Sequence, residues 1–409
     1  MMKNKLPQLC DWDKCTACTA CASSCPQLAI TMQENEKGEL FPFVDEEKCI
    51  GCGLCEKTCP EMNDSLSRNE LSIVYGCWLK NSTNRTQSTS GGAAYAISCT
   101  VIEQGGHVWG AAFADDMSPV YVEANTIEGL RQIQKSKYVQ CALRDCFRKI
   151  KEELDNGELV LFTGTSCHVK GLLSFLRKKY DNLLTLDLVC HGVPGQGVFR
   201  KYKDYLENRY NDKLDFFTFR PKRIHDGQEE SYYALAHFTN KGDVKIRKIE
   251  NGYLTGFYRS IFLRECCYDC KGNGCQRYTD FTVADFWGIG KIKPFPLWRE
   301  RTRGVSMLAL NTPNAIKFFE KIKEKIEYEL RSIEEATFCN LPYIQSAVKS
   351  SKTESFWKDW CILEWEELSV KYFMESRKEK ILYVIKKIFP PICHYMLKFW
   401  RSGAGKINI

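Results

Sequence analysis

Eight cysteines near the N-terminus have the spacing of iron–sulfur ligands. They form two C-x2-C-x2-C-x3-C runs, each followed by proline: Cys15, Cys18, Cys21 and Cys25, then Cys49, Cys52, Cys55 and Cys59. In such runs three thiolates from one loop bind a 4Fe–4S cluster, and the fourth cysteine reaches the other cluster. We therefore expect Cys59 to complete the first set and Cys25 to complete the second. Structural zinc sites, the alternative, usually take ligand pairs separated by a longer loop.

This spacing is similar to that of bacterial two-cluster ferredoxins, and the resemblance covers residues 10–62. Ala17, Ala20, Gly51 and Gly53 are small neighbours that leave backbone N–H groups free to bond cluster sulfurs. We expect short strands at 29–32 and 41–44 between the runs. Such a module moves one electron at a time, so it implies a partner site that gives or receives electrons.

Four later cysteines are candidates for a third 4Fe–4S cluster. Cys167 and Cys190 each follow a predicted strand, and Cys267 and Cys270 form a C-x-x-C pair that can supply two corners of one cluster. In one alternative, Cys266 or Cys275 replaces one of these ligands. In the others, the pair is a redox dithiol or half of a zinc site, or all four cysteines are free thiols. The basic neighbours Arg264 and Arg277 either lower the cost of a negatively charged cluster or are solvated.

The rest of the sequence predicts the elements that position these residues. Apolar runs indicate strands at 72–78, 107–113, 159–162 and 183–189, and helical periodicity indicates helices at 91–104, 144–154 and 170–179. Strand–loop–helix units favour a partly parallel sheet with sites at the strand ends. Residues 214–250 have the pattern of antiparallel strands. We therefore expect a mixed α+β and α/β fold, in which a small ferredoxin-like domain precedes a larger mixed-sheet flavin-binding domain.

Six short motifs in this body resemble those of the coenzyme F420 hydrogenase/dehydrogenase beta-subunit family. They occur in the family's order within 71–345: Ser90-Gly91-Gly92, 136–140, 164–167, 187–194, 267–270 and 285–288. The resemblance implies FAD, with FMN as the alternative, and a 4Fe–4S cluster near the flavin. The implied flavin-binding residues are Ser90, Gly91, Gly92, Ser136, Lys137, Tyr138, Gln140, Gly164 and Thr165. The body has neither the Rossmann glycine motif nor a phosphate-loop lysine motif.

Two residues are candidates for a catalytic role. His191 directly follows Cys190, and a loop histidine can transfer a proton or simply form a hydrogen bond. Lys137 lies within a family motif that implies contact with flavin or an anionic substrate, while the alternative is a solvated charge.

The charge is concentrated at one end of the chain. The formal net charge is +7, and residues 371–409 alone hold nine Lys and Arg against two Glu. The balanced body argues against a nucleic-acid partner. Basic and apolar residues alternate in the tail, which suits an anionic membrane surface; a helix docked on the body, or a frayed end, is the alternative. With 22 cysteines and no apolar signal core in residues 1–30, we expect a reducing, cytoplasmic location, with peripheral contact at the inner membrane face through the tail.

These features predict four segments and one leading function. The segments are a ferredoxin domain at 1–64, two parts of a flavin domain at 65–180 and 181–345, and a helical basic tail at 346–409. The function is an iron–sulfur flavoprotein oxidoreductase that acts on a small organic substrate and exchanges electrons with a protein or small reductant. The resemblance is to bacterial members associated with surface-polysaccharide genes, so we do not expect F420 itself to be the partner. The rivals are an electron-transfer subunit and a redox sensor.

Overall fold

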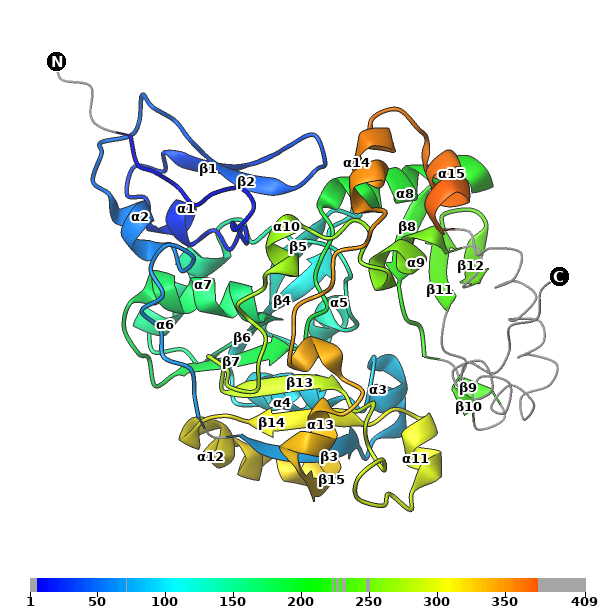
Figure 1. Cartoon of the computed structure of the whole chain (residues 1–409). Helices are drawn as coiled ribbons and strands as arrows, with labels where there is room; N and C mark the ends of the chain where they lie inside the picture. The colour runs from blue at the N-terminus through cyan, green and yellow to red at the C-terminus, as the bar shows by residue number, and fades with distance from the viewer. Residues whose placement is uncertain are drawn as a thin grey trace, which may run out of the picture.

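The structure is a computed structural model that describes residues 6–70, 72–222, 224–225, 228–229, 233–247 and 251–373. An N-terminal module lies against a larger body (Figure 1). The module contains α1 (Ala20–Ser24), α2 (Leu54–Thr58) and an antiparallel hairpin of β1 (Ile30–Glu34) and β2 (Leu40–Val44). Both helices end at the last cysteine of a run, which takes an extended conformation because a proline follows it.

An eight-stranded mixed sheet forms the centre of the body. Its order is β15-β3-β14-β13-β7-β6-β4-β5, and only the pairs from β13 to β4 are parallel. The strands are β3 (Ile73–Leu79), β4 (His107–Phe113), β5 (Pro119–Ala124), β6 (Val160–Thr165), β7 (Leu183–Leu188), β13 (Phe281–Asp285), β14 (Ser306–Leu310) and β15 (Ile326–Arg331). The parallel strands therefore lie in the middle and the antiparallel strands at the edges.

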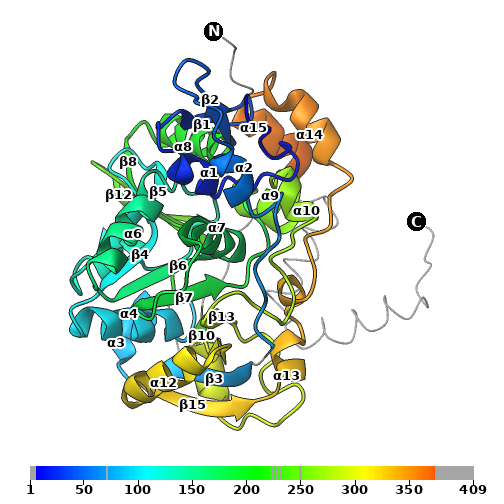
Figure 2. The same cartoon turned by 90° about the vertical axis from the view of Figure 1, so that its left-hand side faces the viewer.

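Helices cover both faces of this sheet (Figure 2). Successive side chains of β6 point to opposite faces of the sheet. Leu161 packs in the core beneath α4 (Ala93–Glu103) and α12 (Pro313–Ile322). Val160 and Phe162 pack in the core beneath α6 (Cys146–Asp155) and α7 (Ser166–Leu176). Short helices α3 (Ser82–Gln87), α5 (Leu130–Ile133), α11 (Trp298–Thr302) and α13 (Ile333–Thr337) lie in the connections.

A second, smaller sheet carries an aromatic core. The strands β8 (Leu214–Thr218), β11 (Tyr233–Phe238) and β12 (Gly242–Arg247) are antiparallel, as 214–250 predicts. Their core includes residues of α8 (Gln196–Tyr210), α9 (Gly252–Tyr258), α14 (Thr353–Trp360) and α15 (Trp365–Leu368). The remaining elements are the two-residue strands β9 (Ile224–His225) and β10 (Gln228–Glu229), the helix α10 (Glu265–Tyr268), the 3-10 turns 323–325 and 341–343, and the π-helical turn 369–373.

The predicted fold class is confirmed: a ferredoxin-like module precedes a large mixed sheet. The helix predicted at 170–179 instead begins at Ser166 and stops at Leu176, because Arg177 takes a left-handed φ of 56°. Both predicted halves of the flavin domain supply strands to the one sheet, so the boundary at 180/181 divides the sequence but not the sheet. The basic tail residues beyond Phe373 lie outside the described residues.

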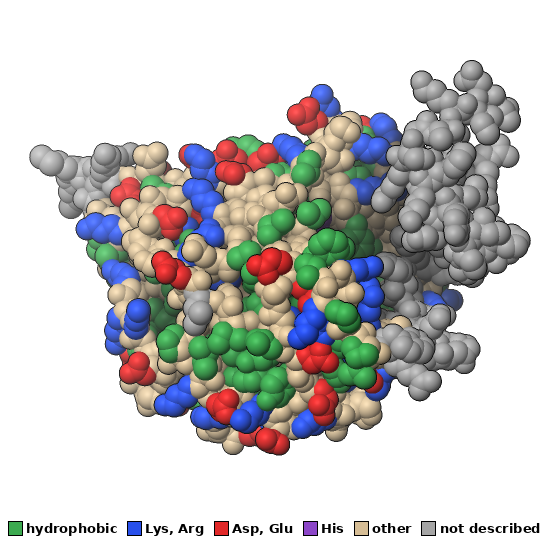
Figure 3. Space-filling model, turned by 60° about the horizontal axis from the view of Figure 1, so that its bottom comes forward, with side chains coloured by type: hydrophobic (Ala, Val, Ile, Leu, Met, Phe, Trp, Pro, Cys, Tyr) green, Lys and Arg blue, Asp and Glu red, His purple; other side chains and the backbone are tan. Residues whose placement is uncertain are grey.

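No helix within the described ranges combines the length and the apolar character needed to cross a membrane. Hydrophobic side chains gather on the lower face of the body, where the sheet ends at β15 (Figure 3). On that edge strand Tyr328 is 42% and Leu330 60% exposed.

Candidate iron–sulfur centres

The first cavity of the ferredoxin module brings together the cysteines predicted to share one cluster. It is lined by Cys15, Cys18, Cys21 and Cys59, together with Cys10. Cys15 and Cys18 come from the loop that leads into α1, Cys21 lies in the first turn of α1, and Cys59 directly follows α2. Ala17 takes a left-handed φ of 54° and donates its N–H to the Cys15 sulfur at 3.4 Å. The sequence predicts this crossed set, whereas Cys10 was not predicted.

The second cavity is built in the same way from the other run. It is lined by Cys49, Cys52, Cys55 and Cys25. Gly51 and Gly53 take left-handed φ values of 67° and 69° in its loop, which side chains rarely adopt. The backbone N–H of Ala29 donates to the Cys25 sulfur at 3.3 Å. Each cavity therefore contains four thiols suited to a 4Fe–4S cluster, and the donor set fits that group.

Burial raises the pKa of three thiols of the first cavity, those of Cys15, Cys18 and Cys21. It raises the pKa of Cys15 to about 11 and that of Cys18 to about 12. Cys59 differs, since the neighbouring Cys10 thiol lowers its pKa. Thiolates are the ligands, so cluster binding must release the protons from Cys15, Cys18 and Cys21.

The four body cysteines predicted for a third cluster also lie together. The thiols of Cys167 and Cys190 are close enough to Cys270 for their charges to interact, and Cys267 interacts with Cys190. Two nearby glycines also lie close to these cysteines. A Cβ added to Gly192 would lie 3.1 Å from the Cβ of Cys267, and a Cβ added to Gly272 would lie 3.5 Å from the Cys270 sulfur. We call Cys167, Cys190, Cys267 and Cys270 the body quartet.

The body quartet repeats a hydrogen-bond pattern of the ferredoxin module. Gly192 donates its N–H to the Cys190 sulfur and Gly272 donates to the Cys270 sulfur, each at 3.3 Å and each two residues along the chain, as at Cys15. Val193 donates to the Cys267 sulfur at 3.4 Å. Such donors stabilise thiolate charge and tune cluster potential. The body quartet is therefore a fitting donor set for a third cluster.

The extra cysteines near the body quartet separate into two kinds. Cys266 hydrogen-bonds to Cys267, which lowers the Cys266 pKa to about 7, and its charge reaches Cys15. Burial raises the pKa of Cys275, whose charged neighbours are Arg277 and Glu334. Cys266 thus lies between the body quartet and the first ferredoxin cavity, whereas the charges near Cys275 are those of Arg277 and Glu334.

Helix α7 joins the first ferredoxin cavity to the body quartet. Cys167 lies in its first turn, and Gly171 lies one turn later against Cys18. A Cβ on Gly171 would stand 2.5 Å from the Cys18 Cβ and 2.8 Å from its sulfur. Lys170, which is buried, donates to the carbonyl of Pro60 at 3.0 Å. Four residues along a helix span only about 6 Å, so the two thiol groups share one short rigid support.

Both arginines that the sequence left open as solvated are buried, each 2% exposed. Arg264 donates to the carbonyls of Cys15 at 2.8 Å and Leu40 at 3.2 Å, so it ties the module to the body. Arg277 donates to the carbonyl of Gly272 at 2.6 Å and pairs with the buried Asp187 at 3.3 Å.

Of the residues predicted to bind flavin, those at 90–92 and those at 136–138 lie near one another. Thr89 accepts a hydrogen bond from the N–H of Ser136 at 3.3 Å, so the segments containing Ser90 and Ser136 lie side by side. Gly91, however, packs against the sheet: its Cβ would lie 2.3 Å from the Cys77 carbonyl. A Cβ on Gly92 would lie 2.3 Å from Leu79 Cδ1. The structure thus assigns these glycines a packing role in seating α4.

Lys137 and Tyr138 lie beside the segment that contains Ser90. Lys137 donates to the carbonyls of Gln132 at 2.9 Å and Gln134 at 2.7 Å, and burial lowers its pKa to about 7. The Tyr138 ring is tilted by 30° against that of Phe257, with their centroids 4.8 Å apart, and its hydroxyl accepts a hydrogen bond from Arg220 at 3.3 Å.

Sequence reasoning missed Arg220, which lies among the rings of Tyr138, Phe257 and Trp287; we call these four residues the aromatic corner. Arg220 pairs with Asp285 at 2.6 Å and lies over the half-exposed ring of Trp287 at 5.5 Å. A lone arginine in a loop carried no signal in the sequence.

The other predicted flavin contacts lie elsewhere. Gln140 is buried and accepts from the N–H of Leu40 in the ferredoxin hairpin at 3.1 Å. Gly164 packs against Tyr121, whose hydroxyl would be 2.8 Å from an added Cβ. Thr165 hydrogen-bonds to the Cys167 sulfur at 3.2 Å, which places it at the body quartet. Only the segments at 90–92 and 136–138 therefore converge.

His191 lies between the body quartet and the aromatic corner. Its Nε2 hydrogen-bonds to the Ser260 hydroxyl at 3.0 Å, and its ring lies 5.3 Å from Phe257. Burial lowers its pKa, which favours the neutral ring. The next histidine toward the N-terminus, His168, is more deeply buried and pairs with the Tyr121 hydroxyl at 3.1 Å.

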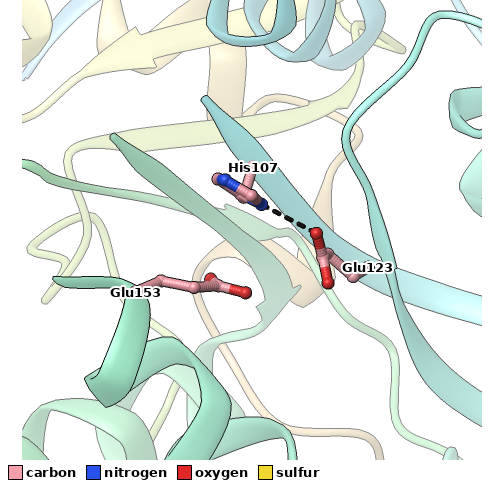
Figure 4. A group of neighbouring side chains, drawn as sticks. All are labelled: His107, Glu123 and Glu153. Carbon is pink, nitrogen blue, oxygen red and sulfur yellow. Dashed lines mark hydrogen bonds and ion pairs between the residues drawn. The ribbon is translucent and has the colours of Figure 1, made fainter. Parts of the chain in front are cut away.

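A separate polar group lies at the far end of β4. The His107 Nδ1 lies 2.7 Å from Glu123, and Glu153 is nearby (Figure 4). Glu153 also accepts from the indole N–H of Trp109 at 2.8 Å. Burial lowers the pKa of His107, but the bond to Glu123 and the neighbouring acidic charges outweigh it and raise the net value. The group is an ion-pair network apart from the cysteine sites.

Comparisons with known proteins agree with this geometry. Residues 157–336 match the model for the C terminus of the coenzyme F420 hydrogenase/dehydrogenase beta subunit, and residues 14–63 match a 4Fe–4S dicluster domain. No curated protein matches the chain. One similar solved structure is the xenon-derivatised F420-reducing NiFe hydrogenase complex from Methanosarcina barkeri. It is 12% identical with a TM-score of 0.42, and the match covers 72% of this chain and 94% of that one.

The dicluster match identifies the first two cysteine sets as a module for two 4Fe–4S clusters, so the chain is an iron–sulfur electron-transfer protein. Residues 157–336 thus resemble the C terminus of the coenzyme F420 hydrogenase/dehydrogenase beta subunit, and a 4Fe–4S dicluster domain precedes them at the N-terminus.

Proposed function

We propose that this protein is an iron–sulfur flavoprotein oxidoreductase that passes electrons between its ferredoxin module and a flavin, to reduce or oxidise a small organic substrate. This proposal rests on one contact: Gly171, which lies on α7 one turn after Cys167, packs against Cys18. The contact puts Cys167 of the body quartet on the helix that packs against Cys18 of the first ferredoxin site, and a relay needs these two sites close together.

The proposed ligands are the three cysteine sets of the site. Cys15, Cys18, Cys21 and Cys59 hold the inner ferredoxin cluster, beside α7. Cys25, Cys49, Cys52 and Cys55 hold the outer one, where Cys52 is exposed. The body quartet holds the third cluster. This order makes the outer cluster the place where an external protein or small reductant exchanges electrons.

The aromatic corner next to the body quartet is the proposed end of the relay. A bound flavin, FAD for preference, would supply the conversion of single electrons into a two-electron or hydride step. The segments at 90–92 and 136–138 meet there, and His191 connects this corner to Cys190. Lys137 and His191 are the candidate proton-transfer groups for the substrate.

Iron analysis tests the relay. The anaerobically reconstituted full chain should hold about twelve irons if all three sets bind clusters and about eight if only the ferredoxin sets do. The combined change Cys167→Ser and Cys190→Ser should remove about four irons and slow flavin reduction. Cys275→Ser is the matched control and should leave both unchanged. About eight irons in parent and variant alike would contradict the third cluster.

The second candidate function is an electron-transfer subunit that serves a partner enzyme. The observation in its favour is the family match, since the family model is that of a hydrogenase/dehydrogenase subunit. Chromatography of the cofactor released on denaturation tests for flavin, whose absence after reconstitution would contradict the enzyme. Steady turnover by the isolated chain would separate enzyme from subunit.

A further inference from the structure

The two ferredoxin cavities differ by one thiol. The second cavity is lined by four cysteines, whereas the first has a fifth, Cys10. The N-terminal segment runs along both walls, but it presents Pro7 to the second cavity and Leu9 and Cys10 to the first. Four thiolates complete a 4Fe–4S cluster, so one thiol of the first cavity is surplus to the cluster's needs.

Cys10 is held next to one particular ligand. Its side chain shares the wall of the first cavity with that of Cys59. Contacts on both sides fix the segment: the N–H of Gln8 donates to the Glu56 carboxylate at 2.5 Å, and the N–H of Cys15 donates to the Asp11 carbonyl at 2.8 Å. Cys10 thus has a fixed place beside Cys59, on the wall of the cluster cavity.

We propose that Cys10 is a reserve ligand of the inner cluster, able to take the iron that Cys59 otherwise binds. The inference rests on the ligand sets proposed above. The exchange involves no oxidation or reduction: the Fe–S bond to Cys59 breaks, a bond from iron to the Cys10 sulfur forms, and the Cys10 proton passes to Cys59.

A reserve ligand makes the two ferredoxin sites unequal, because only the first has a spare thiol. The repeated spacing of the two cysteine runs does not indicate this difference. Cys59 and Cys25 are counterparts, since each is the last cysteine of its run and each completes the other cluster. Cys59 has a thiol beside it, whereas the second cavity is lined by no cysteine besides its own four among the described residues. Loss of Cys59 is therefore tolerated and loss of Cys25 is not.

The test compares Cys59→Ala, Cys25→Ala, Cys10→Ala and the double variant Cys10→Ala/Cys59→Ala in the full reconstituted chain. The readouts are iron and sulfide content and the EPR spectrum of the reduced clusters. Cys59→Ala and Cys10→Ala should each keep the iron content of the parent, and Cys59→Ala should show a shifted signal from one cluster. Cys25→Ala and the double variant should each lose between one and about four irons.

Equal iron loss in Cys59→Ala and in the double variant would overturn the inference, because Cys10 would then contribute nothing. Full iron content in the double variant would also overturn it. A parent with fewer than about eight irons would overturn the inference together with the ligand sets, and that failure is recognised because it occurs without any substitution.

Discussion

The side chain of Arg264 donates a hydrogen bond to the carbonyl of Cys15 across 2.8 Å and 249 residues of sequence. A second bond from the same guanidinium reaches the Leu40 carbonyl at 3.2 Å, and the guanidinium lies over the Phe41 ring at 4.8 Å. One buried cation therefore holds both the first cluster loop and the hairpin of the ferredoxin module against the body.

Replacing this arginine should loosen the module. Arg264→Met leaves two buried carbonyls without a donor, and hydrogen bonds to charged groups are worth about 1.5–3 kcal/mol each. We expect a clear fall in the thermal midpoint and faster proteolysis between residues 64 and 72. Arg200→Met is the matched control, because Arg200 also links module and body but through an exposed pair with Glu34. That change should cost less than about 1 kcal/mol, and equal effects would contradict the prediction.

Gly171→Ala should destabilise the protein, whereas replacing a helical glycine by alanine usually stabilises it. Alanine normally stabilises a helix by about 1 kcal/mol relative to glycine. Here the new Cβ would stand 2.5 Å from the Cβ of Cys18, so the cluster loop must move. We expect loss of iron from the inner cluster and a lower thermal midpoint. Ser174→Ala, on the same helix, should leave the iron content unchanged; iron loss in that control would show a general effect of altering α7.

The buried pair of Asp187 and Arg277 should show strong coupling. Asp187 also accepts from Thr279 at 3.0 Å and Thr282 at 2.6 Å, and it is fully buried. Arg277→Met leaves that carboxylate without its cation, which should cost about 3–5 kcal/mol of unfolding free energy. The double variant Asp187→Leu/Arg277→Met should lose much less than the sum of the single changes. Additive losses in a denaturant-unfolding cycle would refute the coupling.

The ion-pair network at His107 should make stability depend on pH. The folded state raises the pKa of His107, so its stabilising contribution is full below the ordinary value of about 6.5 and is lost as pH rises through the folded value. His107→Gln should therefore lower the thermal midpoint most below about pH 6.5. The difference from the parent should shrink at higher pH, and a difference that grows instead would contradict the sign.

The cysteine sets were predictable from the sequence because the spacing of cysteines along the chain indicates which of them share a cluster. The crossed pairing of Cys59 and Cys25 follows from the trailing prolines, and the strands at 107–113 and 183–189 follow from apolar runs. Cys167 and Cys190 come together because adjacent parallel strands end at one edge.

Long-range placement was not predictable from local patterns. Gln140 lies in a motif beside Tyr138, yet its side chain turns to the ferredoxin hairpin. Gly91 has the appearance of a phosphate-loop glycine, but the approach of β3 explains it. Nothing near Arg264 indicates that it would meet the first cluster loop, because that contact depends on how the module docks. Cys10 lies outside the two spaced runs, so spacing alone does not assign it to the first cavity.

The position of β3 has a consequence for how the protein matures. This strand is the first of the body to be synthesised, yet both of its neighbours in the sheet, β14 and β15, come from residues 306–331. At about 5–20 residues per second, roughly 10–50 s separate its emergence from that of its partners. The two cluster loops are complete at Cys59, so the module can acquire metal during this interval. Cofactor loading would then precede closure of the sheet, and the docked body would enclose a centre that is already assembled.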